Sequence, residues 1–385
     1  MEQHPFWKTQ PIVETSIIPE EDFGPIEVLT IEQIRKEPYN LPEGFEFYTL
    51  DLNCKEDLIS IQTFLNNNYL ETDDDNMRFA YSIDSIKWIS QCPNHFPELF
   101  ICVRTINNKQ IIATIFGIPV KVKVFDKIIK QVEIDLLCVA KKFRNKRLAP
   151  VMIKEVTRRT NLRGIFQAIY TAGMELPNKL TTIQYHHRLL NVKKMSSVGF
   201  YSLPTNNLSI YEKLYKVPQL INNNTCIIRP IETKDISCCV TKLNNYLSEF
   251  NLTHYFEKEN FTHYFMPRKN VIYTYVIEKN NEVTDMISFF IIDNIVSNND
   301  KYKDYKAAYL YYYFNESVKL EELINIALFY AKENKCDVFN ILNMFNLETI
   351  LQECKFIKGN GSLNYYLYNY KCNPLNTNEV GFPMF

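Results

Sequence analysis

The sequence predicts an α/β protein built from two halves with a similar order of strands and helices. Its 385 residues suit two domains of ordinary size better than a single core. Apolar residues make up 46% and aromatic residues 14% of the chain, which excludes a disordered or fibrous class. Segments rich in β-branched residues alternate with segments of helical spacing on both sides of residues 216–226, so the pattern occurs twice.

The first half contains both strand and helix candidates. The strand candidates are residues 47–52, 100–103, 111–118, 120–125 and 132–139. The helix candidates are residues 58–69 and a segment that begins near Pro150. A short apolar run, typical of a strand covered on both faces, is formed by Ile134, Leu136, Leu137, Cys138 and Val139. Pro150 fits the first turn of a helix, because its missing N–H would have no partner there.

A boundary is expected at residues 216–226, where Pro218 and the run Asn222–Asn224 interrupt the pattern. After it, the strand candidates are residues 226–230, 271–278, 287–292 and 307–314, and the helix candidates are residues 240–250 and 321–332. Residues 1–45 are rich in proline and glutamate and are predicted to form an extended arm across the body. The expected division is therefore an arm (1–45), a first half (46–220) and a second half (221–385).

Composition narrows the class of protein further. The net charge of −1 provides no overall field for nucleic acid or an anionic membrane. The N-terminal segment MEQHPFWKTQ lacks the basic and apolar regions of a signal peptide, and no apolar run approaches the ~20 residues of a membrane span. The ten cysteines include no C-x-x-C pair, a distribution typical of reduced thiols rather than disulfides or a zinc site. A cytoplasmic protein is expected.

The basic turn between the apolar strand and the Pro150 helix is the clearest candidate site. It carries five cations within seven residues, namely Lys141, Lys142, Arg144, Lys146 and Arg147. A helix N-terminus offers free N–H groups and a positive dipole end, so a cationic loop at that point is suited to bind phosphate. The chain has neither G-x-G-x-x-G nor a P-loop motif. A turn that is merely solvated remains the alternative from this stretch alone.

The amino-acid sequence of this region is more specific than its charge pattern. The stretch KKFRNKRLAPVMIKEVTRRTNLRGIFQAIYTAG (141–173) resembles the acyl-CoA-binding core of the N-myristoyltransferases. The segment FWKTQP (6–11) looks like a signature of the same family. Further matches are Leu176–Pro177, His187–Arg188, Asp337–Asn340 and Tyr365–Asn369. The resemblance covers nearly the whole chain in family order, and it implies two pseudo-symmetric, acetyltransferase-like (GNAT-type) halves with mixed sheets flanked by helices.

The resemblance implies a coenzyme site in the first half. The phosphate loop would be formed by Arg144, Asn145, Lys146, Arg147, Leu148 and Ala149. Arm residues that close over the coenzyme would be His4, Pro5, Phe6 and Trp7, although a Trp in such an arm is also a common packing anchor. The strand segment Leu136, Leu137, Cys138 and Val139 would border the thioester. In this family the backbone amides of Leu136 and Leu137 would stabilise the oxyanion, and Cys138 is expected to be a buried thiol rather than an acyl carrier.

The general base implied by the resemblance is the terminal carboxylate of Phe385. The apolar tail VGFPMF is typical of a docked segment, and a carboxylate near the substrate ammonium is a plausible proton acceptor, since an α-amine has a pKa of ~8. A tail that only packs remains the alternative. The peptide groove implied by the resemblance consists of Tyr69, Asp73, Asp74, Tyr170, Thr171, Phe200, Ser202, Asn294, Tyr309, Asn340 and Met384.

Several positions depart from the family pattern. The strand reads EIDLLCVAK where family members usually have EINFLCVHK, so Asp135, Leu136 and Ala140 replace Asn, Phe and His. The Leu136 substitution leaves the N–H in place. Asp135 could either repel the oxyanion or hold the substrate ammonium. Near the end, Asn360 replaces an acidic residue, which removes one expected contact to peptide.

The implied activity is transfer of myristate from myristoyl-CoA to the N-terminal glycine amine of proteins. Myristoyl-CoA would be a co-substrate, and no metal or redox cofactor is expected. The partners would be N-terminal-glycine peptides and proteins, with no nucleic acid and no stable membrane insertion, and the protein is expected to be a monomer. Two alternatives remain open. One is another acyl-CoA N-acyltransferase with a shorter acyl chain, and the other is an inactive module that binds acyl-CoA or peptide.

Overall fold

A computed structural model describes residues 5–12, 17–69, 76–202, 207–220 and 226–385. In its first half, the helices and strands are β1 (Phe45–Thr49), α1 (Lys55–Asn68), β2 (Met77–Ala80), α2 (Ile83–Ser90), β3 (Phe100–Thr105), β4 (Ile111–Val124), β5 (Lys127–Val139), α3 (Leu148–Asn161), β6 (Ala168–Ala172), β7 (Thr181–Leu189), α4 (Val192–Ser197) and α5 (Leu208–Leu214). The expected strands and helices of this half are all present, and β2, β6, β7 and several short helices were not predicted.

The second half has the same kind of composition. Its elements are β8 (Cys226–Pro230), α6 (Ile236–Leu247), β9 (Leu252–His254), α7 (Lys258–Phe265), β10 (Ile272–Lys279), β11 (Glu282–Val296), β12 (Asp304–Asn315), α8 (Leu320–Glu333), β13 (Val338–Leu342), α9 (Glu348–Glu353), β14 (Ile357–Tyr368) and β15 (Val380–Gly381). The predicted strands correspond to β8, β10, β11 and β12, and the predicted helices to α6 and α8.

One difference from the prediction concerns β4, which runs unbroken through the two segments expected as separate strands. Pro119 lies inside it, paired with Val132 of β5. On its other edge, β4 pairs with β3 as far as Phe116 and with β9 from Val122 onward. Pro119 lies between these stretches, where its missing N–H costs no ladder hydrogen bond.

All the strands join in one sheet that has pseudo-two-fold order. From the central pair β14–β7, the order outward is β6, β5, β4, β3, β1 on one side and β13, β12, β11, β10, β8 on the other. Each side has a long antiparallel hairpin, β4–β5 or β11–β12, followed by a helix and a parallel strand. The α/β class with two pseudo-symmetric halves is therefore confirmed, although the two halves share one continuous sheet.

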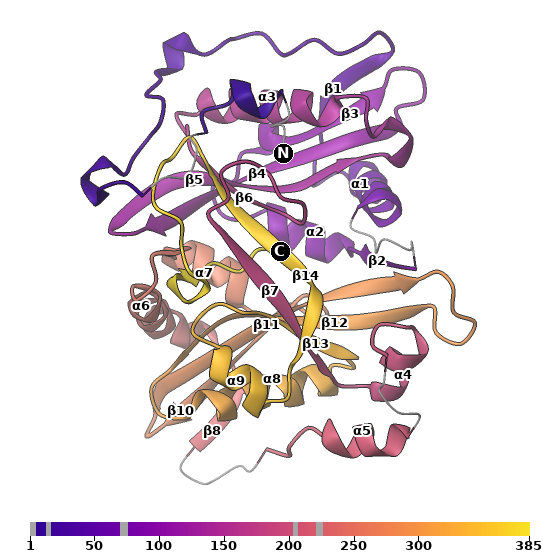
Figure 1. The fold of residues 1–385 in the computed structure, drawn as a ribbon, viewed down its shortest axis with the longest axis vertical. Coiled ribbons are helices and arrows are strands. Elements are labelled where there is room, and N and C mark those ends of the chain that lie inside the picture. Colours follow the sequence, from indigo (N-terminus) through magenta and orange to yellow (C-terminus); the bar gives the residue numbers. More distant parts are fainter. Residues whose placement is uncertain (1–4, 13–16, 70–75, 203–206, 221–225) are drawn as a thin grey trace.

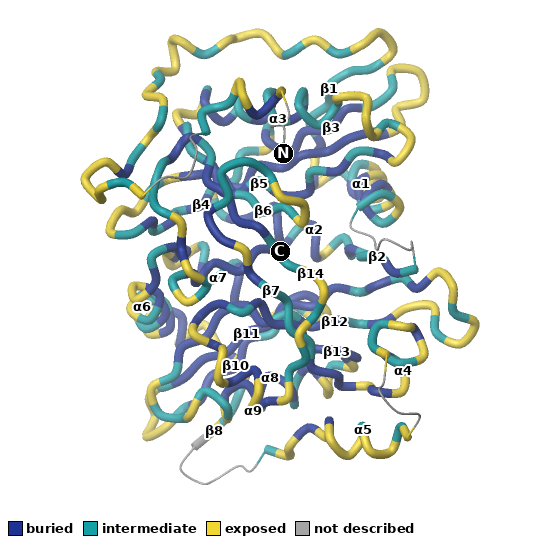
Figure 2. The backbone as a smooth tube through the Cα atoms, viewed as in Figure 1, coloured by how far each residue is buried: buried dark blue, intermediate teal, exposed yellow. Residues whose placement is uncertain are grey.

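The two halves exchange strands at the centre of the molecule. β7 comes from the first half of the chain but pairs with β13, and β14 comes from the second half but pairs with β6 (Figure 1). Buried residues follow the strands through both halves, whereas exposed residues lie on loops and outer helices (Figure 2). This arrangement places β5, β14 and the chain's C-terminal segment in one central region.

The N-terminal arm is bound along the body by backbone contacts. The Ile18 amide donates to Asn373 Oδ1, and the Glu27 amide donates to Asn369 Oδ1, each at 2.8 Å. Further along, the Lys36 carbonyl accepts from Arg158 of α3 at 2.9 Å. Of the helices in the described parts of the chain, none is long and apolar enough to cross a membrane.

Candidate active site

A cavity of about 940 Å³ lies between β5 and α3. Its walls are largely apolar and include Ile115, Ile134, Ile153, Val156 and Phe166. The residues predicted for the coenzyme that line it are Phe6, Trp7, Leu137, Val139, Arg144, Asn145, Arg147, Leu148 and Ala149. Pro5, Leu136, Cys138 and Lys146 do not line it, and His4 lies outside the described residues. Two residues predicted for the peptide groove, Tyr170 and Thr171, also belong to its wall.

The N-terminus of α3 forms part of the cavity wall. Asn145 and Arg147 have left-handed backbone conformations (φ 65° and 57°), and Arg147 is the N-cap residue of the helix. Among the described residues, no side chain caps this end and no acidic residue lies in the first turn of α3, so its first N–H groups are available to an anion. Pro150 lies in that first turn, as predicted. The basic turn is therefore built to receive an anion.

Arg147 lines the cavity whereas its neighbour Lys146 does not, which makes the two residues a matched pair for a charge test. Arg147→Glu is expected to weaken myristoyl-CoA binding, measured by calorimetry, because a carboxylate then faces the phosphates at a helix N-terminus. Lys146→Glu makes the same charge change on an exposed side chain beside it and is expected to have the smaller effect. Equal affinities of wild type and Arg147→Glu would contradict the assignment of the loop.

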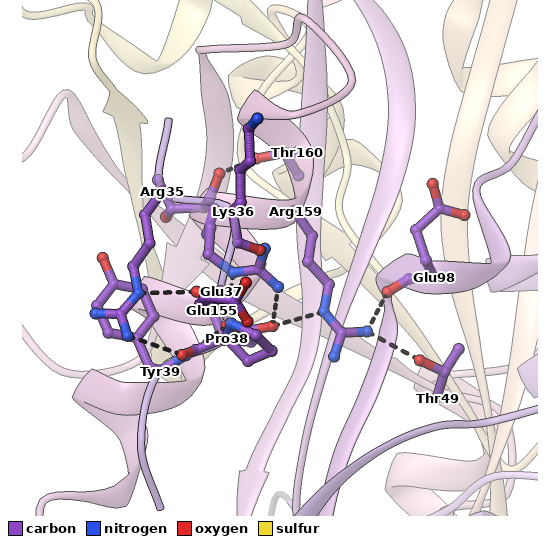
Figure 3. Close-up of polar contacts among 12 residues, drawn as sticks. Arg35, Lys36, Glu37, Pro38, Tyr39, Thr49, Glu98, Glu155, Arg159 and Thr160 are labelled. Atoms are coloured by element: carbon purple, nitrogen blue, oxygen red, sulfur yellow. Dashed lines mark hydrogen bonds and ion pairs between the residues drawn. The ribbon is translucent and has the colours of Figure 1, made fainter. Parts of the chain in front are cut away.

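A buried carboxylate holds α3 in place. Glu155 accepts hydrogen bonds from Arg158 at 2.6 and 3.0 Å, from Arg159 at 2.8 Å and from the Tyr39 amide at 3.2 Å (Figure 3). Arg159 also reaches Thr49 of β1 and the carbonyl of Glu98. Burial alone would raise the pKa of Glu155, but the hydrogen bonds from the two arginines outweigh it and lower this pKa. The network ties the N-terminal arm and β1 to the helix that borders the cavity.

Next to the cavity, β5 contains a bulge at the predicted oxyanion donors. Cys138 pairs with Thr114 and Asp135 with Phe116, so Leu136 and Leu137 lie together opposite Ile115. Leu136 has a left-handed conformation (φ 51°), and its carbonyl accepts from the Thr114 hydroxyl at 2.8 Å. The extra residue turns the Leu137 side chain toward the cavity, while Leu136 and Cys138 pack in the central core on the opposite face.

The Leu136 amide is already hydrogen-bonded, which the sequence did not indicate. It donates to Oδ1 of Asp135 at 2.7 Å. Asp135 and Glu133 lie two residues apart on β5 and are both buried, with 7% and 1% of their surfaces exposed. Burial raises the pKa of Glu133 to about 8, and burial together with the charge of Glu133 raises the pKa of Asp135 to about 7.

The C-terminal segment reaches this central region from the other side. Thr253 of β9 donates to the Gly381 carbonyl at 2.8 Å, and Tyr365 of β14 donates to the Phe382 carbonyl at the same distance. A Cβ on Gly381 would lie 2.9 Å from the ring of Phe345, so this part of the tail is tightly packed. The ring of Phe385 contacts four aromatic side chains, those of Trp88, Tyr264, Phe290 and Tyr311.

Several peptide-groove candidates form one aromatic cluster. Tyr309 stacks on Phe290, with ring centres 5.1 Å apart, and Phe200 packs against His187 at 5.0 Å. His187 is hydrogen-bonded to Asn340 at 2.7 Å. The other candidates are spread around this cluster or outside it. The ring of Tyr69 packs against that of Tyr81. Met384 and Asn294 are buried, and Ser202 is exposed. Asp73 and Asp74 lie outside the described residues.

Some residues of this central region were missed from the sequence. They are Glu133, Trp88, His254 and Tyr311, which come from four elements that meet only in the fold. The one available signal was the pair of acids alternating in an apolar strand, Glu133 and Asp135. No group of three or more metal-ligating side chains occurs among the residues that the structure describes.

Comparisons with known proteins identify the family of the chain. The models of the N-terminal and C-terminal domains of myristoyl-CoA:protein N-myristoyltransferase match residues 25–183 and 197–381. Glycylpeptide N-tetradecanoyltransferase 1 of Arabidopsis thaliana is 40% identical over 96% of this chain and 86% of its own length. The enzyme of Plasmodium falciparum is 39% identical over 98% of this chain and 92% of its own length.

A solved structure is similar over the whole chain. Saccharomyces cerevisiae N-myristoyltransferase with bound myristoyl-CoA superposes with a TM-score of 0.94, at 34% identity and with complete coverage of both chains. The matches to both domain models extend across the bulge, the basic turn and the C-terminal segment up to Gly381. The chain belongs to the N-myristoyltransferase family.

Proposed function

We infer that this chain transfers myristate from myristoyl-CoA to the N-terminal glycine amine of peptides and proteins. The observation that carries this inference is the cavity between β5 and α3. Its volume is about 940 Å³, its walls are largely apolar, and its lining includes the uncapped N-terminus of α3 and residues of the basic turn. The fatty chain would fill the interior, and the phosphates would bind the N–H groups of α3 and the side chain of Arg147.

The oxyanion of the tetrahedral intermediate would form at the β5 bulge. Leu137 lines the cavity, so its amide is the donor we assign first to the thioester oxygen. The Leu136 amide would be the second donor, for which the thioester oxygen has to compete with Asp135 Oδ1. Phe6 and Trp7 of the arm, which line the same cavity, would cover the coenzyme, and Trp7 stacks on Tyr170 at 6.2 Å.

The terminal carboxylate of Phe385 would accept the proton from the substrate ammonium. The neutral amine would then attack the thioester carbon, forming the C–N bond and releasing CoA as the C–S bond breaks. Glycine is required by sterics, because a side chain on the first residue would collide where amine, thioester and base meet. The peptide behind the glycine would lie along the aromatic cluster that includes Tyr309, Phe200 and Asn340.

We propose a separate role for each of the three segments of the chain. The arm (1–45) closes over the coenzyme, residues 46–220 bind myristoyl-CoA, and residues 221–385 bind the peptide and supply the base. We further propose that the protein acts in the cytoplasm as a monomer and contributes to lipoprotein biosynthesis.

The inference is tested by following free CoA thiol with a glycine-initial peptide and either myristoyl-CoA or acetyl-CoA. Release with myristoyl-CoA, and none when the first residue is alanine, is the expected result. Release with acetyl-CoA alone would instead indicate an N-acyltransferase for shorter chains. No release with either thioester, despite binding, would indicate an inactive binding module, a result that the occupied Leu136 amide would then explain.

A further inference from the structure

Glu133 and Asp135 are two buried acidic residues that lie two positions apart on β5. They lie on the same face of β5, since residues two apart in a strand point the same way. Among the described residues, no lysine or arginine makes an ion pair with either carboxyl group. His254 Nε2 is 3.7 Å from Glu133, but burial lowers the pKa of His254 to about 3, so the imidazole is neutral at physiological pH.

Among the described residues, Oδ2 of Asp135 and Oε1 of Glu133 lack a close partner, as do two buried donors, the Tyr81 hydroxyl and Trp88 Nε1. The Tyr69 hydroxyl interacts with Asp135 and offsets part of the rise in its pKa. Two unpaired negative charges in such an interior would be very costly. The pair therefore holds a proton in the free protein and is suited to exchange it for another cation.

The pair lies at the point where the reaction would occur. Oδ1 of Asp135 is 2.7 Å from the Leu136 amide, one of the two donors assigned to the thioester oxygen. An attacking amine has to come within ~3–3.5 Å of the thioester carbon, so it arrives beside Asp135. Besides burial, the charge of Asp135 contributes to the raised pKa values of Tyr69 and Tyr81, so both side chains lie near it.

Aromatic groups surround the second acid. The groups that interact with the charge of Glu133 come from the loop after α2 and from β9, α7, β12 and β14, and they are Cys92, His254, Tyr264, Tyr311, Tyr312 and Tyr365. The ring of the terminal residue, Phe385, packs on two of these, Tyr264 and Tyr311. Two acids with several aromatic side chains nearby form an environment that favours a small cation.

We propose that the Glu133–Asp135 pair binds the α-ammonium of the substrate glycine, which replaces the proton held by the pair in the free enzyme. The proposal rests on the proposed function and adds the group that recognises the amine before it reacts. From the bound ammonium one proton passes to the terminal carboxylate, and the amine lone pair then forms the C–N bond. The C–S bond breaks, and the proton lost from the attacking nitrogen goes to the sulfur of CoA.

The sign of the pH dependence follows from competition between proton and ammonium. Below about pH 7 Asp135 is protonated, and Glu133, with a pKa of about 8, is protonated as well, so the pair carries no negative charge and glycine peptides should bind weakly. Affinity should rise as the pH increases through 7 and stop rising near pH 8, where the α-amine itself loses its charge. Binding near pH 6.5 should release a proton.

The experiment compares two peptides on enzyme loaded with an unreactive thioether analogue of myristoyl-CoA. One peptide begins with glycine, and in the other an acetyl group replaces the glycine, which removes only the ammonium. Wild type should prefer the glycine peptide at pH 7.5 by about tenfold or more, as expected for a charge-assisted hydrogen bond. Calorimetry at pH 6.5 in two buffers of different ionisation enthalpy should show proton release with this peptide only.

Asp135→Asn keeps the shape of the side chain and an oxygen for the Leu136 amide. This substitution should reduce the preference for the glycine peptide about tenfold and lower the number of protons released on binding. The acetyl peptide should bind as it does to wild type. Asp126→Asn, which removes a charge at the β4–β5 turn, is the matched control and should change neither quantity. An unchanged preference in Asp135→Asn, or equal affinity of wild type for both peptides, would overturn the proposal. Failure of wild type to bind either peptide would instead count against the proposed function.

Discussion

Amidation of the Phe385 carboxyl group is expected to lower kcat by about 10²–10⁴-fold, the usual contribution of a general base. Amidation removes the charge and changes the shape very little, so the aromatic contacts of Phe385 with Trp88, Tyr264, Phe290 and Tyr311 should remain. Myristoyl-CoA affinity should be unchanged, because the cavity is lined by β5, α3 and the arm. Rates are measured as CoA thiol release by amidated and unmodified protein.

Two variants separate the carboxylate from the packing of the tail. Deleting Phe385 moves the carboxylate back by ~3.3 Å and should reduce kcat as amidation does. Phe385→Leu removes the aromatic ring and keeps the carboxylate, so it should retain much more activity than the amidated protein. If the C-terminal tail has only a packing role, the order of activities is reversed: Phe385→Leu is impaired and the amidated enzyme is fully active. That result would leave Asp135 as the next candidate for the base.

Glu155→Ala should lower the free energy of unfolding by about 3–5 kcal/mol, the typical cost of removing one partner from a buried ion pair. The substitution leaves the guanidinium of Arg158 buried without its carboxylate and removes the acceptor of the Tyr39 amide. Chemical denaturation at pH 7 measures the loss.

Glu98→Ala is the matched control, since its side chain pairs with Arg163 where both groups are partly exposed, and a loss below about 1 kcal/mol is expected. The stabilisation by Glu155 is present at neutral pH and should disappear as the pH falls through its lowered pKa. The difference between wild type and Glu155→Ala should therefore narrow in acid. Equal losses from the two variants at pH 7 would contradict the role of Glu155.

The sequence predicted the hairpins and helices, because their hydrogen bonds join residues close in sequence and their buried faces follow a regular residue spacing. The hairpins β4–β5 and β11–β12, and the helices α3 and α8, have long runs with clear periodicity, and α3 begins within two residues of Pro150. The strands β6, β7 and β14 were missed because their partners are remote in sequence. The Leu363–Ile183 pair, for example, joins segments that no periodicity relates.

The sequence also predicted only those parts of the candidate site that are formed by residues close in sequence. The basic turn is a run of consecutive residues and was predicted. Of the four β5 residues that the family resemblance implied, Leu137 and Val139 line the cavity, whereas Leu136 and Cys138 do not. The left-handed conformation of Leu136 was not predicted, because nothing in the run Leu136–Leu137 distinguishes a bulge from a regular strand. The hydrogen bond from the Leu136 amide to Asp135 and the aromatic wall around Glu133 depend on that bulge and on strands from the other half.

The most direct test of the account is the mass of a glycine-initial peptide after incubation with myristoyl-CoA and the enzyme. Fragmentation should place a single myristoyl group on the α-nitrogen of glycine, and a peptide of the same sequence with a blocked N-terminus should stay unmodified. Acylation of a lysine side chain instead of the α-amine, or an unchanged peptide in the presence of bound myristoyl-CoA, would contradict the account.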